Sequence, residues 1–185
     1  MPHRRRLIAI AFIVTCSVAA SWATWDRIGY ALFANSGCGS PSIKCASQLR
    51  QIGIALQIYS NNNGKHYPPS FDALLDDGLS TEMFICSKTL DERAIGPTTQ
   101  AVIRDFQKPG HNSYVYVAAG ASDQSNSSTF VLAYEPIGHH GPGTNILYGD
   151  GHVAYVTRPE AARVLSELQS GFNPPRPPST QPSIR

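Results

Sequence analysis

Side chains that could do chemistry gather between residues 135 and 152. His139 and His140 lie in a glycine-rich loop, and Asp150 and His152 follow shortly after it. Imidazole and carboxylate groups are the ligands of many transition-metal sites, and a carboxylate with loop carbonyls would suit calcium. The stretch therefore offers a candidate metal site at His140, Asp150 and His152, with Glu135 nearby in sequence.

A purely structural role would also explain several of these residues. Asp150 and Gly151 separate two β-favouring runs, and Asp-Gly is a strong hairpin signal because both residues reach positive φ at low cost. The histidines would then donate hydrogen bonds that pin the loop. The sequence contains no nucleophile elbow, phosphate loop or paired-carboxylate pattern. We therefore expect no catalytic residues and no enzymatic activity.

The cysteines admit several arrangements. We predict a disulfide between Cys45 and Cys86, because this bond would tie the start of a helix to the body of the domain. A local bond between Cys38 and Cys45 is the alternative, and free thiols are a third. The spacing of these three cysteines does not match a zinc motif.

The N-terminal segment predicts export. Arginines at positions 4–6 precede an uncharged apolar run from Leu7 to about Thr24, which is long enough to cross a bilayer as a helix. A cleaved signal peptide and a lipid-modified Cys16 are the alternatives. We expect an uncleaved single-pass anchor in the inner membrane, with the C-terminal domain in the periplasm or extracytoplasmic space.

The composition favours one modest domain. The chain has 185 residues, 42% of them hydrophobic, and a formal charge of +2. Beyond the N-terminal arginines there is no basic cluster, so we expect no nucleic-acid partner. The expected organisation is an anchor or signal at 1–25, a linker at 26–44, an α+β domain at 45–157, a short helix at 158–170 and a disordered Pro-rich tail at 171–185.

Periodicity places the main helix. Leu49, Ile52, Leu56 and Tyr59 recur at intervals of three and four, which is typical of a helix with one buried face. We predict this helix over about 46–60, because the Asn and Gly residues that follow suit a helix C-terminus. A shorter helix is predicted at 71–75, and no element is predicted from 86 to 110.

Four β-favouring runs follow. Their expected bounds are 113–118, 129–134, 144–149 and 152–157. Strands that are neighbours in sequence usually pair, so an antiparallel sheet of about four strands is expected. With the 46–60 helix packed on one face, the fold class is α+β.

These features together resemble the pilin-like bacterial proteins described by an H-X9-DG signature. Here the signature residues are His140, Asp150 and Gly151, and the resemblance covers roughly residues 40 to 157. It rests also on the 45–70 helical segment, Phe84-Ile-Cys86-Ser87, Ser113-Tyr-Val-Tyr and Ala133-Tyr-Glu-Pro136.

The resemblance implies a type IV pilin or type II secretion pseudopilin architecture, in which a long N-terminal helix starts in the membrane and packs on an antiparallel sheet. The run from Met1 to Thr24 lacks the Gly and Glu on which prepilin processing and filament assembly depend. We therefore expect a membrane-anchored, non-enzymatic, bacterial envelope protein. It would contact secretion-system or other envelope proteins in secretion or surface assembly. The alternative is an exported metal-binding domain built on His140, Asp150 and His152.

Overall fold

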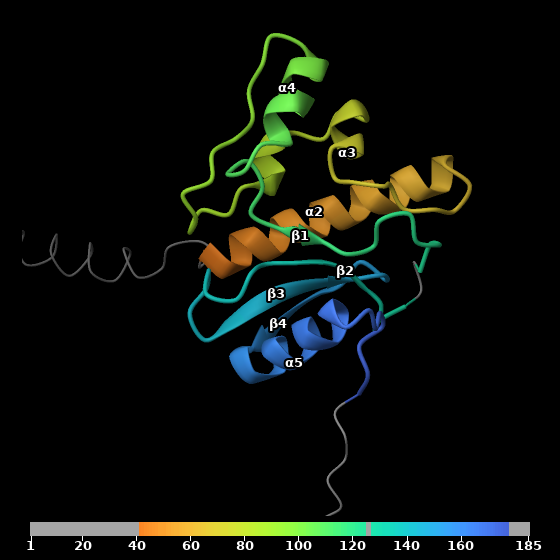
Figure 1. Cartoon of the computed structure of the whole chain (residues 1–185), viewed down its shortest axis with the longest axis vertical. Coiled ribbons are helices and arrows are strands. Elements are labelled where there is room, and N and C mark those ends of the chain that lie inside the picture. The colour runs from red at the N-terminus through yellow and green to blue at the C-terminus, as the bar shows by residue number, and fades with distance from the viewer. Residues whose placement is uncertain (1–40, 125–126, 178–185) are drawn as a thin grey trace, which may run out of the picture. The chain divides into compact units, whose positions relative to one another are not determined.

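The computed structural model describes residues 41–124 and 127–177, which form an α+β unit beginning at Pro41 (Figure 1). Its four-stranded sheet is antiparallel, in the order β1-β2-β3-β4. The α+β class and the four-stranded antiparallel sheet predicted from the sequence are confirmed. In chain order the elements are α2 (Pro41–Asn62), α3 (Ala73–Asp76), the 3-10 helix η1 (Thr81–Phe84), α4 (Thr99–Phe106), β1 (Val115–Tyr116), β2 (Val131–Tyr134), β3 (Gly143–Tyr148), β4 (Val153–Thr157) and α5 (Arg158–Gln169).

Helix α2 packs on one face of the sheet, and its buried stripe is the one that the periodicity predicted. Leu49, Ile52 and Leu56 are completely buried. Gly53 permits close approach to β3, because a Cβ there would lie 2.8 Å from Leu147 Cδ1. The helix reaches back to Pro41, the first described residue, and is therefore longer than the expected 46–60.

Helix α5 covers the opposite face of the sheet (Figure 1). Val164 of α5 is buried against Val131, Tyr134 and Ile146. Because helices lie on both faces, every residue of β2 is buried. The predicted C-terminal helix is thus present and contributes a second hydrophobic cluster.

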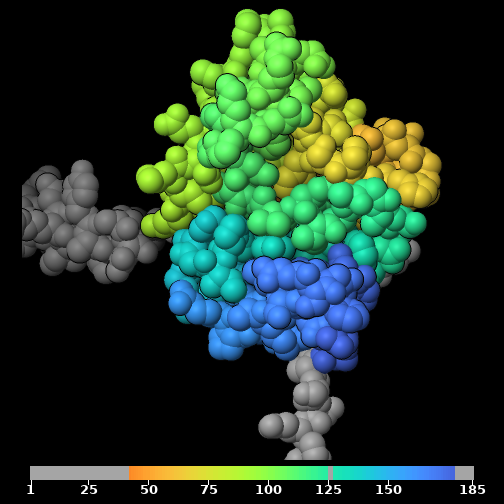
Figure 2. Space-filling view, viewed as in Figure 1, coloured from red at the N-terminus to blue at the C-terminus, as the bar shows by residue number. Residues whose placement is uncertain are grey.

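The region from 86 to 110, for which no element was predicted, contains α4. The Thr98 side chain accepts a hydrogen bond from the Ala101 backbone N–H, which caps the helix, while Ile103 and Phe106 are buried. An eight-residue helix is too short for periodicity to stand out. In Figure 2 the α3 and α4 segments form a lobe apart from α5.

The prediction of a membrane-spanning helix is not borne out by the described residues. Its residues, 7–24, lie outside the described part of the chain, and no helix within 41–124 or 127–177 is long and apolar enough to cross a membrane. The longest of the described helices, α2, carries Lys44, Arg50 and several glutamines. A transmembrane helix and single-pass location in the inner membrane are therefore not supported by the structure.

Candidate metal centre

Four potential metal ligands converge on one buried point. The Cys45 and Cys86 Sγ atoms, a Glu135 carboxylate oxygen and a His140 ring nitrogen all lie within 4.8 Å of one another. The Sγ atoms are 3.0 Å apart, Cys86 Sγ is 3.3 Å from His140 Nε2, and that nitrogen is 3.0 Å from Glu135 Oε1. Ligand atoms around a tetrahedral zinc ion would be roughly 3.3–3.8 Å apart, given bonds of about 2.0–2.3 Å. Small side-chain shifts would therefore accommodate an ion.

The four ligands come from four separate segments. Cys45 lies near the start of α2, and Cys86 lies in the turn after η1, 41 residues later. Glu135 directly follows β2, and His140 lies in the loop that leads into β3. The sheet and α2 must therefore pack together before the ligands can meet.

The cluster is closed to solvent. Cys45, Cys86 and Glu135 have no exposed surface, and the His140 side chain is 3% exposed. A buried carboxylate is costly unless it is paired and hydrogen-bonded. Complete enclosure by protein ligands is typical of structural rather than catalytic zinc sites, which keep one position open.

Asn145 orients the Glu135 carboxylate. Its backbone N–H and its side-chain amide both donate to Glu135 Oε2, at 3.2 and 2.7 Å, which leaves Oε1 facing His140. The same amide donates to the Ser42 carbonyl of α2 at 3.0 Å. Hydrogen bonds of this kind commonly fix ligating carboxylates from behind.

The cysteine side of the cluster is also supported by hydrogen bonds. The Cys86 backbone N–H donates to Ser113 Oγ at 2.9 Å, and this hydroxyl donates to Asp91 Oδ2 at 2.6 Å. Burial, with the hydrogen bond and charge of Cys86, raises the pKa of the Cys45 thiol well above its usual range, although a hydrogen bond with Tyr114 acts in the opposite direction. The thiol is therefore protonated at neutral pH in the metal-free protein, and a metal ion would have to displace that proton.

Contacts from β4 and α5 hold the loop that carries His140. The Tyr155 hydroxyl donates to the His140 carbonyl at 2.9 Å, and the Arg158 guanidinium donates to the Gly141 carbonyl at 3.0 Å. Both contacts are on the exposed side of the loop. The imidazole is thus directed inward while its backbone is held from outside.

The arrangement does not suit a cysteine that is activated through a Cys-His-acid relay. In a Cys-His-acid relay the histidine contacts the nucleophile through one ring nitrogen and the acid through the other. Here Cys86 Sγ and Glu135 Oε1 both approach His140 Nε2. Because the thiol and the carboxylate approach the same nitrogen, the geometry favours a metal ion bound by all three side chains over a proton relay between them.

The structure separates the residues that the sequence grouped. Asp150 and His152 lie at the β3–β4 hairpin, where Asp150 Oδ1 accepts from the His152 backbone N–H at 3.1 Å and lies 2.5 Å from its Nδ1. Gly151 has a φ of +84°, which is the predicted turn role. Across residues 41–124 and 127–177, neither Asp150 nor His152 joins a group of three or more potential metal ligands; His140 alone of the predicted set does.

The predicted disulfide partners lie side by side. Cys45 and Cys86 are free thiols in this structure, whereas Cys38 lies outside the described residues, so the pairing stays a prediction. Sequence reasoning missed both cysteines as metal ligands, because their spacing matches no compact motif. Glu135 gave one usable signal, since a carboxylate directly follows the apolar run of β2.

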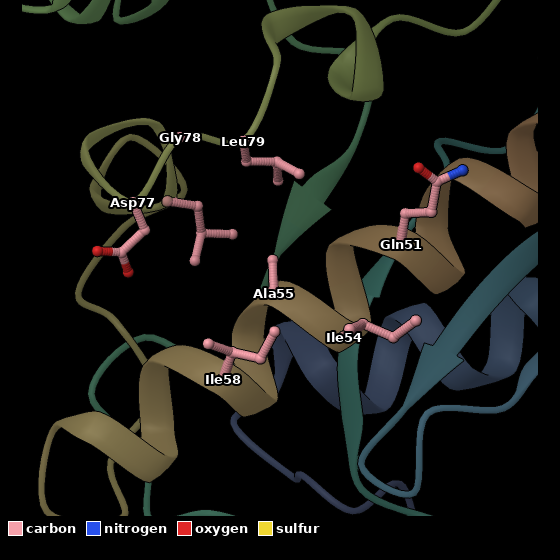
Figure 3. Close-up of a pocket in the computed structure, with 8 residues that line it drawn as sticks. Gln51, Ile54, Ala55, Ile58, Asp77, Gly78 and Leu79 are labelled. Atoms are coloured by element: carbon pink, nitrogen blue, oxygen red, sulfur yellow. The ribbon is translucent and has the colours of Figure 1, made fainter.

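An apolar groove lies elsewhere, between α2 and the segment 74–79 (Figure 3). Its volume is about 340 Å³, and Ile54 and Ile58 on its α2 side are each 53% exposed. Its lining contains one carboxylate, Asp77, and neither His nor Cys. The groove suits contact with another apolar surface rather than chemistry.

No protein-family model, curated protein or solved structure matches the chain. The resemblance to H-X9-DG pilin-like proteins accordingly stays a prediction. Function has to be inferred from the geometry of the site.

Proposed function

We propose that the domain binds one transition-metal ion, best fitted by zinc, through Cys45, Cys86, Glu135 and His140. The observation that carries this proposal is the convergence of four ligand atoms, from four segments, to within 4.8 Å in a place without solvent access. The proposed role of the ion is structural.

The donor set selects the class of metal. Two sulfurs with one imidazole and one carboxylate suit a tetrahedral zinc ion. Calcium prefers six to eight oxygen ligands, and this cluster offers a single carboxylate. The calcium alternative expected from the sequence therefore has little support at this position.

The ion would join parts of the fold that are distant in sequence. It would connect the start of α2, the turn after η1 and the β2–β3 loop through one centre. Metal-binding free energy becomes folding free energy when the site exists only in the folded chain. The ion would then stabilise the folded domain by linking these three segments.

Cobalt substitution tests the proposal. The reduced full-length chain should take up one Co²⁺ per molecule and show thiolate-to-cobalt charge-transfer absorption with intense tetrahedral ligand-field bands. Cys86→Ser should lose these bands, whereas the matched hairpin variant His152→Ala should keep them. Absence of stoichiometric metal from the reduced wild type would refute the proposal.

We propose as a second function that the outer face of α2 makes protein contacts with another copy of this chain. Three exposed isoleucines of α2 support it: Ile43, Ile54 and Ile58 are 62%, 53% and 53% exposed. The helix carries basic and no acidic residues, while Asp77 lines the groove and Asp76 precedes it in the chain. One surface thus offers both charges for pairing between copies.

Sedimentation tests this second proposal. The wild type should associate as concentration rises, and Ile54→Glu with Ile58→Glu should abolish association. Leu90→Glu is the control, because Leu90 is fully exposed and does not belong to α2. A wild type that stays monomeric at high concentration would exclude self-association through this face.

A further inference from the structure

The four ligands divide into two pairs that need no ion. Cys45 and Cys86 approach each other to 3.0 Å, and Glu135 and His140 approach each other to 3.0 Å. A disulfide would leave the two sulfurs uncharged. Glu135 keeps its contact with His140 without an ion, and its other oxygen already accepts two hydrogen bonds from Asn145.

We propose, on the basis of the metal site proposed above, that oxidation of its two cysteines controls metal binding at this centre. A hydroperoxide oxidises Cys45 and Cys86 to a disulfide and the metal ion is expelled. Metal and disulfide exclude each other because they use the same two sulfurs. A thiol reductant and fresh metal reverse the change.

The proposed reaction balances without a change in the metal. One cysteine thiolate attacks hydrogen peroxide, the O–O bond breaks, and a sulfenic acid and hydroxide form. The second thiolate attacks the sulfenic sulfur, which forms the S–S bond and releases a second hydroxide. Two electrons pass from the sulfurs to the peroxide, and zinc leaves as Zn²⁺ because it has lost both thiolate ligands.

The disulfide would keep the domain folded after the metal ion has left. A Cys45–Cys86 disulfide joins the same two segments, the start of α2 and the turn after η1, that the ion would join. Only the β2–β3 loop loses its internal attachment to these segments. The hydrogen bonds from Tyr155 and Arg158 to that loop lie outside the cluster and are independent of the ion.

The burial of the thiols selects a small oxidant. Neither cysteine has exposed surface, so a bulky disulfide would need extensive opening. The loop that carries His140 is partly exposed, since Gly138 and Gly141 are both exposed. Local opening of this loop would admit a molecule of the size of hydrogen peroxide.

Zinc release on oxidation tests the proposal. The zinc-loaded full-length chain is treated with hydrogen peroxide while a chromogenic chelator reports free zinc, and a non-reduced digest identifies the bond formed. One zinc ion should appear per Cys45–Cys86 disulfide, with unchanged far-ultraviolet circular dichroism. Dithiothreitol followed by zinc should restore the starting stoichiometry.

Two variants keep the result interpretable. Cys38→Ser should behave as wild type, because Cys38 is outside the proposed pair. His140→Ala should bind zinc poorly yet still form the Cys45–Cys86 disulfide, since both thiols remain.

The contrary outcomes separate this proposal from the metal site itself. A reduced chain that binds no zinc would defeat both proposals. Zinc that binds and is then retained after peroxide, or is released only with irreversible sulfinic acids or a bond to Cys38, would overturn the redox control and leave the metal site standing.

Discussion

Two histidine–carboxylate pairs in this domain have the same chemistry and opposite surroundings. His140 Nε2 lies 3.0 Å from Glu135, with side chains 3% and 0% exposed. His152 Nδ1 lies 2.5 Å from Asp150, with side chains 43% and 32% exposed. Two thiols adjoin the first pair, while solvent adjoins the second. The two pairs contain the same types of side chain, so it is the burial and the neighbouring thiols that make the first pair a candidate metal centre.

The energetic consequences of the two pairs also differ. An exposed ion pair contributes about 0–1 kcal/mol, because water screens it and both side chains lose freedom. A buried pair has already lost its hydration and depends on every remaining partner. We therefore expect large effects from changes at the first pair and small effects at the hairpin.

The largest effect should follow loss of a sulfur ligand. Cys86→Ser should remove stoichiometric zinc and with it the zinc-dependent stabilisation, about 4 kcal/mol when zinc exceeds its dissociation constant about 1,000-fold. Zinc content by mass spectrometry and urea unfolding with and without zinc measure both. His152→Ala is the matched change at the hairpin and should retain zinc; the reverse pattern would locate the metal at the hairpin.

A smaller effect should follow loss of the residue that orients Glu135. Asn145→Ala should lower zinc affinity about 10–100-fold in a chelator competition, because the carboxylate loses its side-chain donor. Asn173→Ala is the control: its amide bonds the Val131 backbone twice, at 2.8 Å each. It should lower stability by about 1–3 kcal/mol with unchanged zinc affinity. Equal affinity losses in the two variants would mean that only general stability matters.

A kinetic effect should appear at the loop. Tyr155→Phe removes the hydroxyl that holds the His140 carbonyl. Zinc release to excess chelator should accelerate about fivefold, the equivalent of about 1 kcal/mol in loop opening. Tyr148→Phe is the control, because Tyr148 stacks on His152 at the hairpin. Equal acceleration in both variants would argue against the loop as the exit route.

The smallest effect should be at the hairpin carboxylate. Burial acts to raise the pKa of Asp150, but hydrogen bonds from His152 outweigh it and hold this pKa below its usual value. A lowered folded-state pKa contributes stability above the unfolded pKa, and this is lost as pH falls through the folded pKa. Asp150→Asn should therefore cost at most about 1 kcal/mol near neutral pH and less in acid. The midpoints of urea unfolding near neutral pH and in acid measure this loss of stability. A greater loss in acid would contradict a lowered pKa of Asp150.

Local patterns were sufficient to predict most of the fold. The stripe at Leu49, Ile52 and Leu56 predicted α2, and the Asp150-Gly151 turn predicted the β3–β4 hairpin. Helix α4 was missed because its stability comes from Ile103 and Phe106 packing on distant residues rather than from a long repeat. The expected membrane helix falls on residues that the structure does not describe.

The candidate site was less predictable, because its ligands are distant in sequence. The H-X9-DG spacing suggested that His140 and Asp150 cooperate. Strand β3 separates them by roughly 17 Å, at about 3.4 Å per residue. Cys45 and Cys86 reach His140 only through the packing of α2 and η1 against the sheet, which residue spacing does not encode.

Zinc K-edge X-ray absorption of the purified, reduced full-length chain tests the central claim most directly. The proposed centre requires one zinc ion per chain with two sulfur ligands at about 2.3 Å and two nitrogen or oxygen ligands at about 2.0 Å. A spectrum fitted by nitrogen and oxygen ligands alone, or a chain without bound zinc, would contradict it.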